Sequence, residues 1–161
     1  ARGVEYDAQG SIVGYGLTLK ETPHALEVNG QSLFTWCALD TLIFPQLLDR
    51  PARIQSAHRD GSTPVQITAN AAGVTSVEPA TAVISLVNPD DLSQIRSAFC
   101  NQVHYFASPE EAGPWLERHP EATVIPVAAA FELATTLAKA MRTDPTARPS
   151  GIPDPDGASC C

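Results

Sequence analysis

Both halves of this 161-residue chain predict the same order of elements, in which two strands are followed by a helix and a further strand. In the first half, alternating apolar residues predict strands at 11–19 and 24–28, and a helix begins at Cys37. In the second half, the β-prone run 81–87 precedes a helix that ends near Cys100. This order predicts an α+β fold, with two β-β-α-β units forming small mixed or antiparallel sheets with flanking helices, rather than a doubly wound parallel sheet.

Turn and cap residues place the boundaries of several elements. The pair Asn29-Gly30 suits a tight hairpin turn with positive φ angles, and Pro45 should kink or end the first helix. The run 108–111 combines a capping serine, a proline and two acids, which predicts a helix start. Apolar residues at helical spacing predict a last packed helix over 127–141. Further strands are predicted at 52–58, 65–69 and 103–107.

The chain is long enough for one domain with a hydrophobic core, which we expect to cover residues 1–142. Proline, glycine, aspartate and serine dominate residues 143–161, so this tail should be disordered. No apolar run approaches the roughly 20 residues that cross a bilayer, and no secretion signal is visible. A cytoplasmic location is therefore expected.

The charge balance argues against one class of function. Ten basic and 18 acidic residues give a net charge of −8, and the sequence has no cluster of lysine or arginine. Because nucleic-acid binding draws most of its affinity from basic side chains that neutralise phosphates, this class of partner is not expected.

The four cysteines are Cys37, Cys100, Cys160 and Cys161. An even number of cysteines is compatible with disulfides in a secreted protein. In a reducing cytosol the same residues would be free thiols, available for metal binding or catalysis. Composition alone leaves both interpretations open.

A thiol and a carboxyl group lie three residues apart in the motif Cys37-Ala-Leu-Asp40. On a helix these positions share a face, so both side chains can address one ligand. The helix N-terminus should also favour the thiolate form of Cys37. In an isolated motif of this kind, a buried structural cysteine and a capping aspartate are the more common explanation.

The remaining chemical groups are less specific. Cys100 by itself is typical of a small core residue, since free cysteine is often buried. The histidines are not spaced as a ligand set, and no zinc, phosphate-loop or hydrolase motif is present. Zinc, nucleotide and hydrolase chemistry therefore lack support. The histidines are His24, His58, His104 and His119.

Several segments nevertheless match one known family in order and with few gaps. These segments are 14–19, 36–45, 77–80, 85–87, 97–100 and 103–108. Together they span roughly residues 5 to 140 and closely resemble the organomercurial (alkylmercury) lyases. Several motifs in register are far more specific than a Cys-x-x-Asp pair alone, so the resemblance implies that residues 1–142 are the catalytic core of such a lyase.

The resemblance implies a catalytic set of Cys37, Asp40 and Cys100, which also binds the mercury of substrate and product. Mercury is a soft metal, and thiolates are the soft ligands that a protein offers. Asp40 would take a thiol proton and pass it to the leaving carbon, and apolar neighbours such as Trp36 or Phe99 would raise its pKa by desolvation. No cofactor is implied; reduced thiols, or a mercuric reductase as partner, would accept the Hg(II) product.

Three features depart from the family or add to it. The resemblance begins after the winged-helix-like segment that members usually carry. Some members have a further cysteine directly after the second catalytic one, where this chain has Asn101. The pair Cys160-Cys161 resembles the terminal pair by which mercuric reductases collect Hg(II), so it is a candidate for product hand-off; the alternative is a terminus without a role.

Two alternatives to the lyase remain open. One is a non-catalytic protein that binds soft metals such as mercury or copper, because the lyase fold resembles that of copper-delivery lipoproteins of the nitrous-oxide reductase system. The other is a degenerate relative without catalysis. Asp40 favours the lyase, since metal binding alone needs no proton donor three residues from a ligand.

Overall fold

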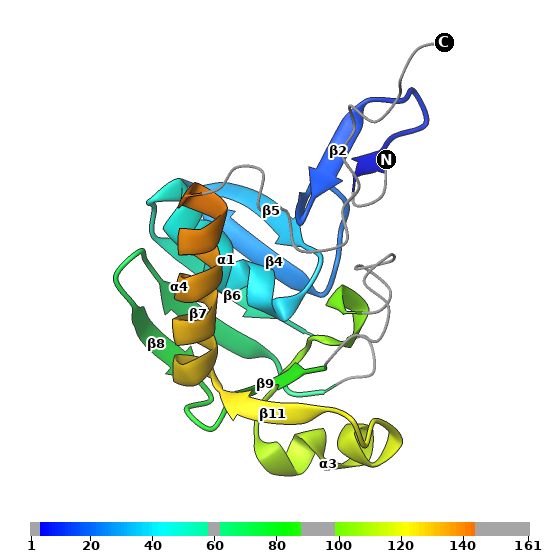
Figure 1. Ribbon diagram of the computed structural model, residues 1–161, viewed down its shortest axis with the longest axis vertical. Coiled ribbons are helices and arrows are strands. Elements are labelled where there is room, and N and C mark those ends of the chain that lie inside the picture. Colours follow the sequence, from blue (N-terminus) through cyan, green and yellow to red (C-terminus); the bar gives the residue numbers. More distant parts are fainter. Residues whose placement is uncertain (1–3, 58–61, 88–98, 144–161) are drawn as a thin grey trace.

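The computed structural model describes residues 4–57, 62–87 and 99–143, which form two antiparallel sheets with helices packed against them (Figure 1). The larger sheet has the strand order β1-β2-β3-β5-β4-β6-β7-β8. Its strands are β1 (Glu5–Tyr6), β2 (Ile12–Tyr15), β3 (Leu17–Thr18), β4 (His24–Val28), β5 (Gln31–Thr35), β6 (Ala52–Ser56), β7 (Val65–Ala69) and β8 (Val74–Glu78). The smaller sheet has the order β10-β9-β11, from β9 (Val83–Leu86), β10 (Tyr105–Phe106) and β11 (Thr123–Pro126). The helices are α1 (Ala38–Leu48), the 3-10 helix η2 (Cys100–Gln102), α3 (Pro109–Arg118) and α4 (Val127–Thr143).

Strands β4 and β5, helix α1 and strand β6 follow one another as a β-β-α-β unit, although its first two strands are β4 and β5 and not the pair of strands predicted at 11–19 and 24–28. Strands β4 and β5 form a hairpin, and Asn29 and Gly30 turn it with φ angles of 53° and 75°. Strand β6 returns antiparallel to β4 on its other side. Alternate residues of β4 are buried, so its inner face lies against α1. The local turn chemistry and the alternation of the strands are therefore confirmed.

Pro45 does not end the first helix, which was one of its two predicted effects. Helix α1 runs through Pro45 to Leu48 and ends at Asp49, which has a left-handed φ of 52°. The proline lies in the last turn, where its missing N–H removes a single helical hydrogen bond. Its own carbonyl accepts hydrogen bonds from the backbone N–H groups of Asp49 and Arg50, which complete the turn.

The single strand predicted at 11–19 is also wrong. The chain reverses at Gly16, whose φ is 70°, and the two halves pair as β2 and β3. Glycine adopts positive φ without steric cost, so it permits this tight reversal. The alternating apolar pattern consequently does not form one face, and Leu19 at its end is 69% exposed.

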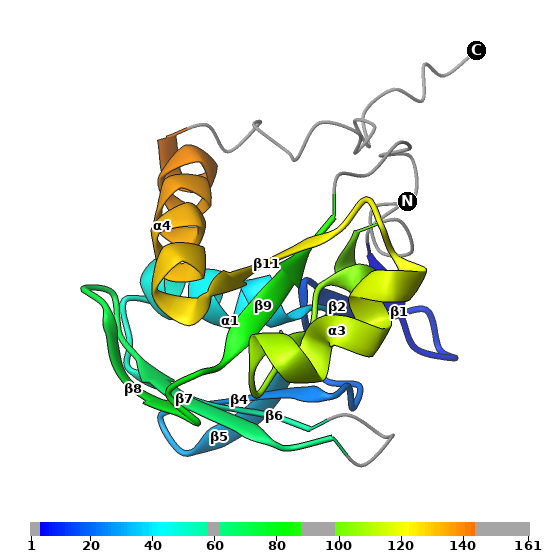
Figure 2. The same ribbon diagram turned by 90° about the horizontal axis from the view of Figure 1, so that it is seen from below.

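The second half of the chain is arranged differently from the first. Strands β7 and β8 extend the larger sheet, whereas β9 and β10 belong to the smaller one, so the second predicted unit is divided between two sheets. In Figure 1, β11 and α3 lie at the lower edge of the view, and Figure 2 shows α3 and α4 on opposite sides of β9. The α+β class with antiparallel sheets is confirmed. Most of the helix predicted before Cys100 lies outside the described residues. The tail predicted from 143 also lies outside them, except for Thr143, which is the last residue of α4.

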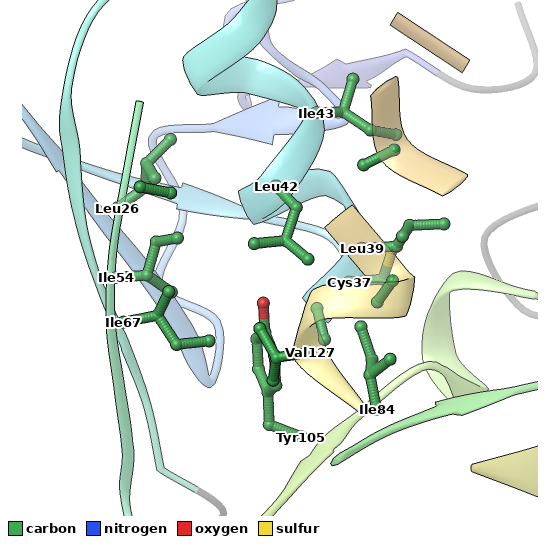
Figure 3. Packing of buried hydrophobic residues seen from close by; sticks show 14 of the residues in the cluster. Leu26, Cys37, Leu39, Leu42, Ile43, Ile54, Ile67, Ile84, Tyr105 and Val127 are labelled. Atoms are coloured by element: carbon green, nitrogen blue, oxygen red, sulfur yellow. The ribbon is translucent and has the colours of Figure 1, made fainter. Parts of the chain in front are cut away.

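The two sheets share one hydrophobic core with α1 and α4. Leu42 of α1 is fully buried at the centre of this core. On one side of it lie Leu26, Ile54 and Ile67 of the larger sheet, and on the other side lies Cys37 (Figure 3). Helix α4 packs along α1, confirming the predicted last helix. Among the described residues, no helix has the length and apolar character needed to cross a membrane.

Candidate active site

Cys37 lies where β5 ends and α1 begins. Its backbone is extended, with φ −144° and ψ 168°, and it occupies the N-cap position of the helix without a capping hydrogen bond from its side chain. The Thr35 hydroxyl donates a hydrogen bond of 2.9 Å to the Cys37 carbonyl, which holds this junction. The Cys37 side chain is 1% exposed. Asp40 lies in the first turn of α1, one turn further along.

Cys100 opens the 3-10 helix η2 and is buried. The sequence predicted it near the end of an α-helix, but the 88–98 part of that helix lies outside the described residues. The backbone N–H of Ala38, the first residue of α1, donates a 3.1 Å hydrogen bond to the carbonyl of Val103. A free N–H at a helix start needs such a partner. The segment that carries Cys100 therefore caps the helix that carries Asp40.

The ligand atoms of Cys37, Asp40 and Cys100 lie within 4.8 Å of one another. Within the part of the chain that the structure describes, no other cluster of three or more histidine, cysteine or acidic residues is placed to hold a metal ion. The structure thus brings together the three residues that the resemblance singled out. Their catalytic roles remain a prediction.

Burial changes the proton affinities of these groups. Loss of solvent, then the contact with the Cys100 thiol and the charge of Asp40, raise the pKa of Cys37 well above its ordinary value. The predicted thiolate at the helix N-terminus is therefore wrong for the unliganded site. Burial also raises the pKa of Asp40 to about 6, although the Cys37 thiol and backbone N–H favour the carboxylate. At neutral pH a protonated thiol thus lies beside a carboxylate that is close to accepting a proton.

One carboxylate oxygen of Asp40 is unusually placed. Oδ2 is buried and has no hydrogen-bond partner among the described residues. The turn at Gly16 covers it: a Cβ atom built on Gly16 would lie 4.0 Å from Oδ2 and 3.3 Å from the Phe44 ring. A buried polar atom without a partner is costly, and a catalytic role is one explanation for its presence. The oxygen is therefore available to a group that enters the site.

A second buried carboxylate attaches the β1–β3 strands to the active site. Glu5 Oε2 accepts hydrogen bonds from Thr18 Oγ1 at 2.6 Å and from Trp36 Nε1 at 3.0 Å. The backbone N–H of Trp36, the residue before Cys37, donates to the Gly16 carbonyl at 2.8 Å. The sequence analysis missed Glu5, because its partners are 13 and 31 residues away and no local motif marks them.

Another contact missed by the sequence analysis joins α1 to β10. Thr41 Oγ1 donates to the Ala38 carbonyl at 2.6 Å and lies 2.8 Å from the Tyr105 hydroxyl. Thr41 and Tyr105 are both buried, and burial raises the pKa of the tyrosine. The first turn of α1 is therefore fixed to β10 as well as to β5.

The other predicted candidates are not part of this site. His24 is buried on β4, where its Nδ1 lies 2.9 Å from the Ser56 hydroxyl. His104 and His119 contact the ring of Trp115. These are the structural environments expected for histidines without ligand spacing. His58, Cys160 and Cys161 lie outside the described residues, so the proposed hand-off pair stays a prediction.

Known proteins are similar to this sequence over most of its length. The alkylmercury lyase of Streptomyces lividans is 56% identical over 142 residues, which cover 88% of this chain and 66% of that protein. The alkylmercury lyase of Staphylococcus epidermidis is 53% identical over 134 residues, covering 83% of this chain and 62% of that protein. The chain therefore spans less than two thirds of the length of these curated relatives.

The fold and the family model agree with these relatives. The crystal structure of the mercury-bound form of MerB2 is similar with a TM-score of 0.75 and 28% sequence identity, over 86% of this chain and 68% of that chain. The alkylmercury lyase family model matches residues 17–139, which include Cys37, Asp40 and Cys100. The resemblance inferred from separate motifs is thus confirmed, and the chain belongs to the alkylmercury lyase family.

Proposed function

We propose that this chain cleaves the carbon–mercury bond of organomercurials by protonolysis, giving a hydrocarbon and Hg(II). The observation that carries the proposal is a carboxyl group with a pKa raised to about 6, buried beside two thiols within reach of one metal ion. A site for metal binding alone would gain nothing from a proton donor. The relatives named alkylmercury lyase support the same reaction class.

In the proposed reaction, the sulfurs of Cys37 and Cys100 replace the other ligand of the mercury atom and form two mercury–sulfur bonds. Thiolates are soft donors, so they bind mercury strongly and push electron density toward the carbon that leaves. Each sulfur gives up one proton as its bond to mercury forms. One proton ends on carbon as a new C–H bond, and the other leaves with the displaced ligand or solvent.

Asp40 carries the proton between sulfur and carbon. At neutral pH its carboxylate lies beside the protonated Cys37 thiol, so it can accept the proton that the thiol loses on binding mercury. The raised pKa then makes the resulting acid available to the carbon, because a proton donor works best when its pKa is near the working pH. The shielded Oδ2 has no other hydrogen bond to break.

The proposal extends to the fate of the product. Hg(II) held by two sulfurs is released when external thiols compete for it, so the reaction needs reduced thiols and no further cofactor. Such thiols are plentiful in a reducing compartment such as the cytoplasm. Transfer to a mercuric reductase, with the pair Cys160-Cys161 as carrier, belongs to the same proposal and rests on the sequence.

Release of hydrocarbon tests the proposed function directly. The reduced full chain is incubated with phenylmercuric acetate and excess thiol, and benzene is followed over time. We expect wild type to form benzene, and the variants Cys37→Ala, Cys100→Ala and Asp40→Ala to fall to the uncatalysed rate. If wild type binds the mercurial tightly but forms no benzene, the chain is a soft-metal binding protein of this fold and the proposal is wrong.

A further inference from the structure

Ser85 of β9 is a fully buried residue that contacts the segment following Cys100. Its hydroxyl donates a 2.8 Å hydrogen bond to the Gln102 carbonyl and accepts a 2.9 Å hydrogen bond from the backbone N–H of His104. The backbone N–H of Ser85 also donates to the His104 carbonyl at 2.9 Å. One side chain thus satisfies a carbonyl and an N–H on either side of Val103.

Val103 itself is bonded to the residue that follows the other cysteine. Its carbonyl accepts the hydrogen bond from Ala38, which directly follows Cys37. Residues 102–104 are therefore held between β9 on one side and the start of α1 on the other. Since Cys100 begins the short helix that ends at Gln102, the position of its sulfur relative to Cys37 depends on these contacts.

We propose that Ser85 is a positioning residue that sets the spacing of the Cys37 and Cys100 sulfurs, and so makes the pair bind one mercury ion through both sulfurs. The inference rests on the part of the proposed function in which both thiols hold mercury. Ser85 does not touch the reacting atoms; it acts through the backbone of the Cys100 segment.

A serine is well suited to this position. Its hydroxyl has one donor and two acceptor sites, so it can serve a carbonyl and an N–H together. Alanine would leave the Gln102 carbonyl without that donor and His104 N–H without that acceptor, in a buried place where such losses are costly. The segment would then shift to find other partners, carrying Cys100 away from Cys37.

A thermodynamic cycle on Hg(II) affinity tests the inference. All proteins are full chains carrying Cys160→Ser and Cys161→Ser, because these thiols would themselves bind mercury. Affinity for Hg(II) alone is measured by competition with a small dithiol, for Ser85→Ala, Cys100→Ser and the double variant. We expect Ser85→Ala to weaken binding by about tenfold or more when Cys100 is present, a coupling of ordinary size for linked residues. In the Cys100→Ser background the same substitution should change nothing, because only one sulfur then binds.

Two further variants separate positioning from general destabilisation. Ser56→Ala removes another buried hydroxyl, one bonded to His24 and not to the Cys100 segment, and should leave Hg(II) affinity unchanged. Ser85→Thr keeps the hydroxyl and should bind Hg(II) within about threefold of wild type, well inside one factor of ten. The inference is overturned if Ser85→Ala weakens binding equally in both backgrounds, or if the threonine variant loses the affinity that the hydroxyl should preserve.

The outcome is independent of catalysis, because free Hg(II) carries no carbon–mercury bond. Coupling between Ser85 and Cys100 in a chain that releases no benzene would overturn the proposed function and support the positioning role. Benzene release without such coupling would overturn only the role of Ser85.

Discussion

Replacing Asp40 by asparagine should lower the rate of benzene release from phenylmercuric acetate by at least about 100-fold, the size expected when a positioned acid–base group is removed. Asparagine has nearly the same shape, but it can neither take the thiol proton nor give it to carbon. The two sulfurs remain, so affinity for Hg(II) should change by less than about tenfold. Turnover and Hg(II) competition, measured on the same preparation, separate the two effects.

Asp49→Asn is a matched control on the same helix. Asp49 is exposed and has a left-handed φ of 52°, a conformation that asparagine also tolerates. This variant should turn over like wild type. An Asp40→Asn protein with full activity would contradict the proton-transfer role and leave only the two cysteines in the proposed chemistry.

The pH dependence of kcat/KM should reveal the same carboxyl group in the free protein. Its pKa is raised from the ordinary aspartate value to about 6, and the carboxylate is the form that accepts the thiol proton. Activity should therefore be lost as the pH falls through about 6, where Asp40 becomes protonated before substrate arrives. Rates measured between pH 5 and about 8 at low substrate concentration test this; a fall only near the ordinary aspartate value would mean that Asp40 is not the group observed.

The largest expected loss of stability comes from Gly14→Ala, at about 2–4 kcal/mol, from overpacking together with broken buried hydrogen bonds. A Cβ atom at this position would lie 2.6 Å from Glu5 Oε2 and 2.7 Å from Thr18 Oγ1. The carboxylate must then move, and Trp36 loses the partner of its indole N–H. Urea unfolding, followed by circular dichroism, gives the change in the free energy of unfolding.

Gly73→Ala provides the control for that experiment. A Cβ atom on Gly73 would meet nothing within 4 Å, and its φ angle is not in the left-handed region. The change should therefore stay within about 0.5 kcal/mol of wild type, as for most surface substitutions. Equal losses of stability in the two alanine variants would show that a clash of the new Cβ atom at position 14 is not the cause.

Features that depend on neighbouring residues were predictable from the sequence. The Asn29-Gly30 turn and the Ser108 cap were correct, because the residues that decide them are adjacent or nearly so. The reversal at Gly16 was missed, because an alternating apolar pattern does not distinguish one strand from two that turn back on each other. The helix end predicted at Pro45 was wrong for a related reason, since the cost of a proline depends on its place in the helix.

The candidate site shows the same division. Cys37 and Asp40 could be paired from their spacing on one helix, whereas Cys100 is 63 residues beyond Cys37 and could be joined to them only by family resemblance. Glu5 and Ser85 were not predicted, because their hydrogen-bond partners are 13 to 31 residues away in the chain. Tertiary packing, not local pattern, selects such residues.

The two cysteines come from different sheets: Cys37 follows β5 of the larger sheet, and Cys100 precedes β10 of the smaller one. A mercury ion held by both sulfurs would therefore be a cross-link between the two sheets. A ligand that binds the folded chain more tightly than the unfolded chain raises the free energy of unfolding. The chain with Hg(II) bound should then be more stable to unfolding than the free chain. An acceptor thiol that removes Hg(II) would also remove this link between the two sheets.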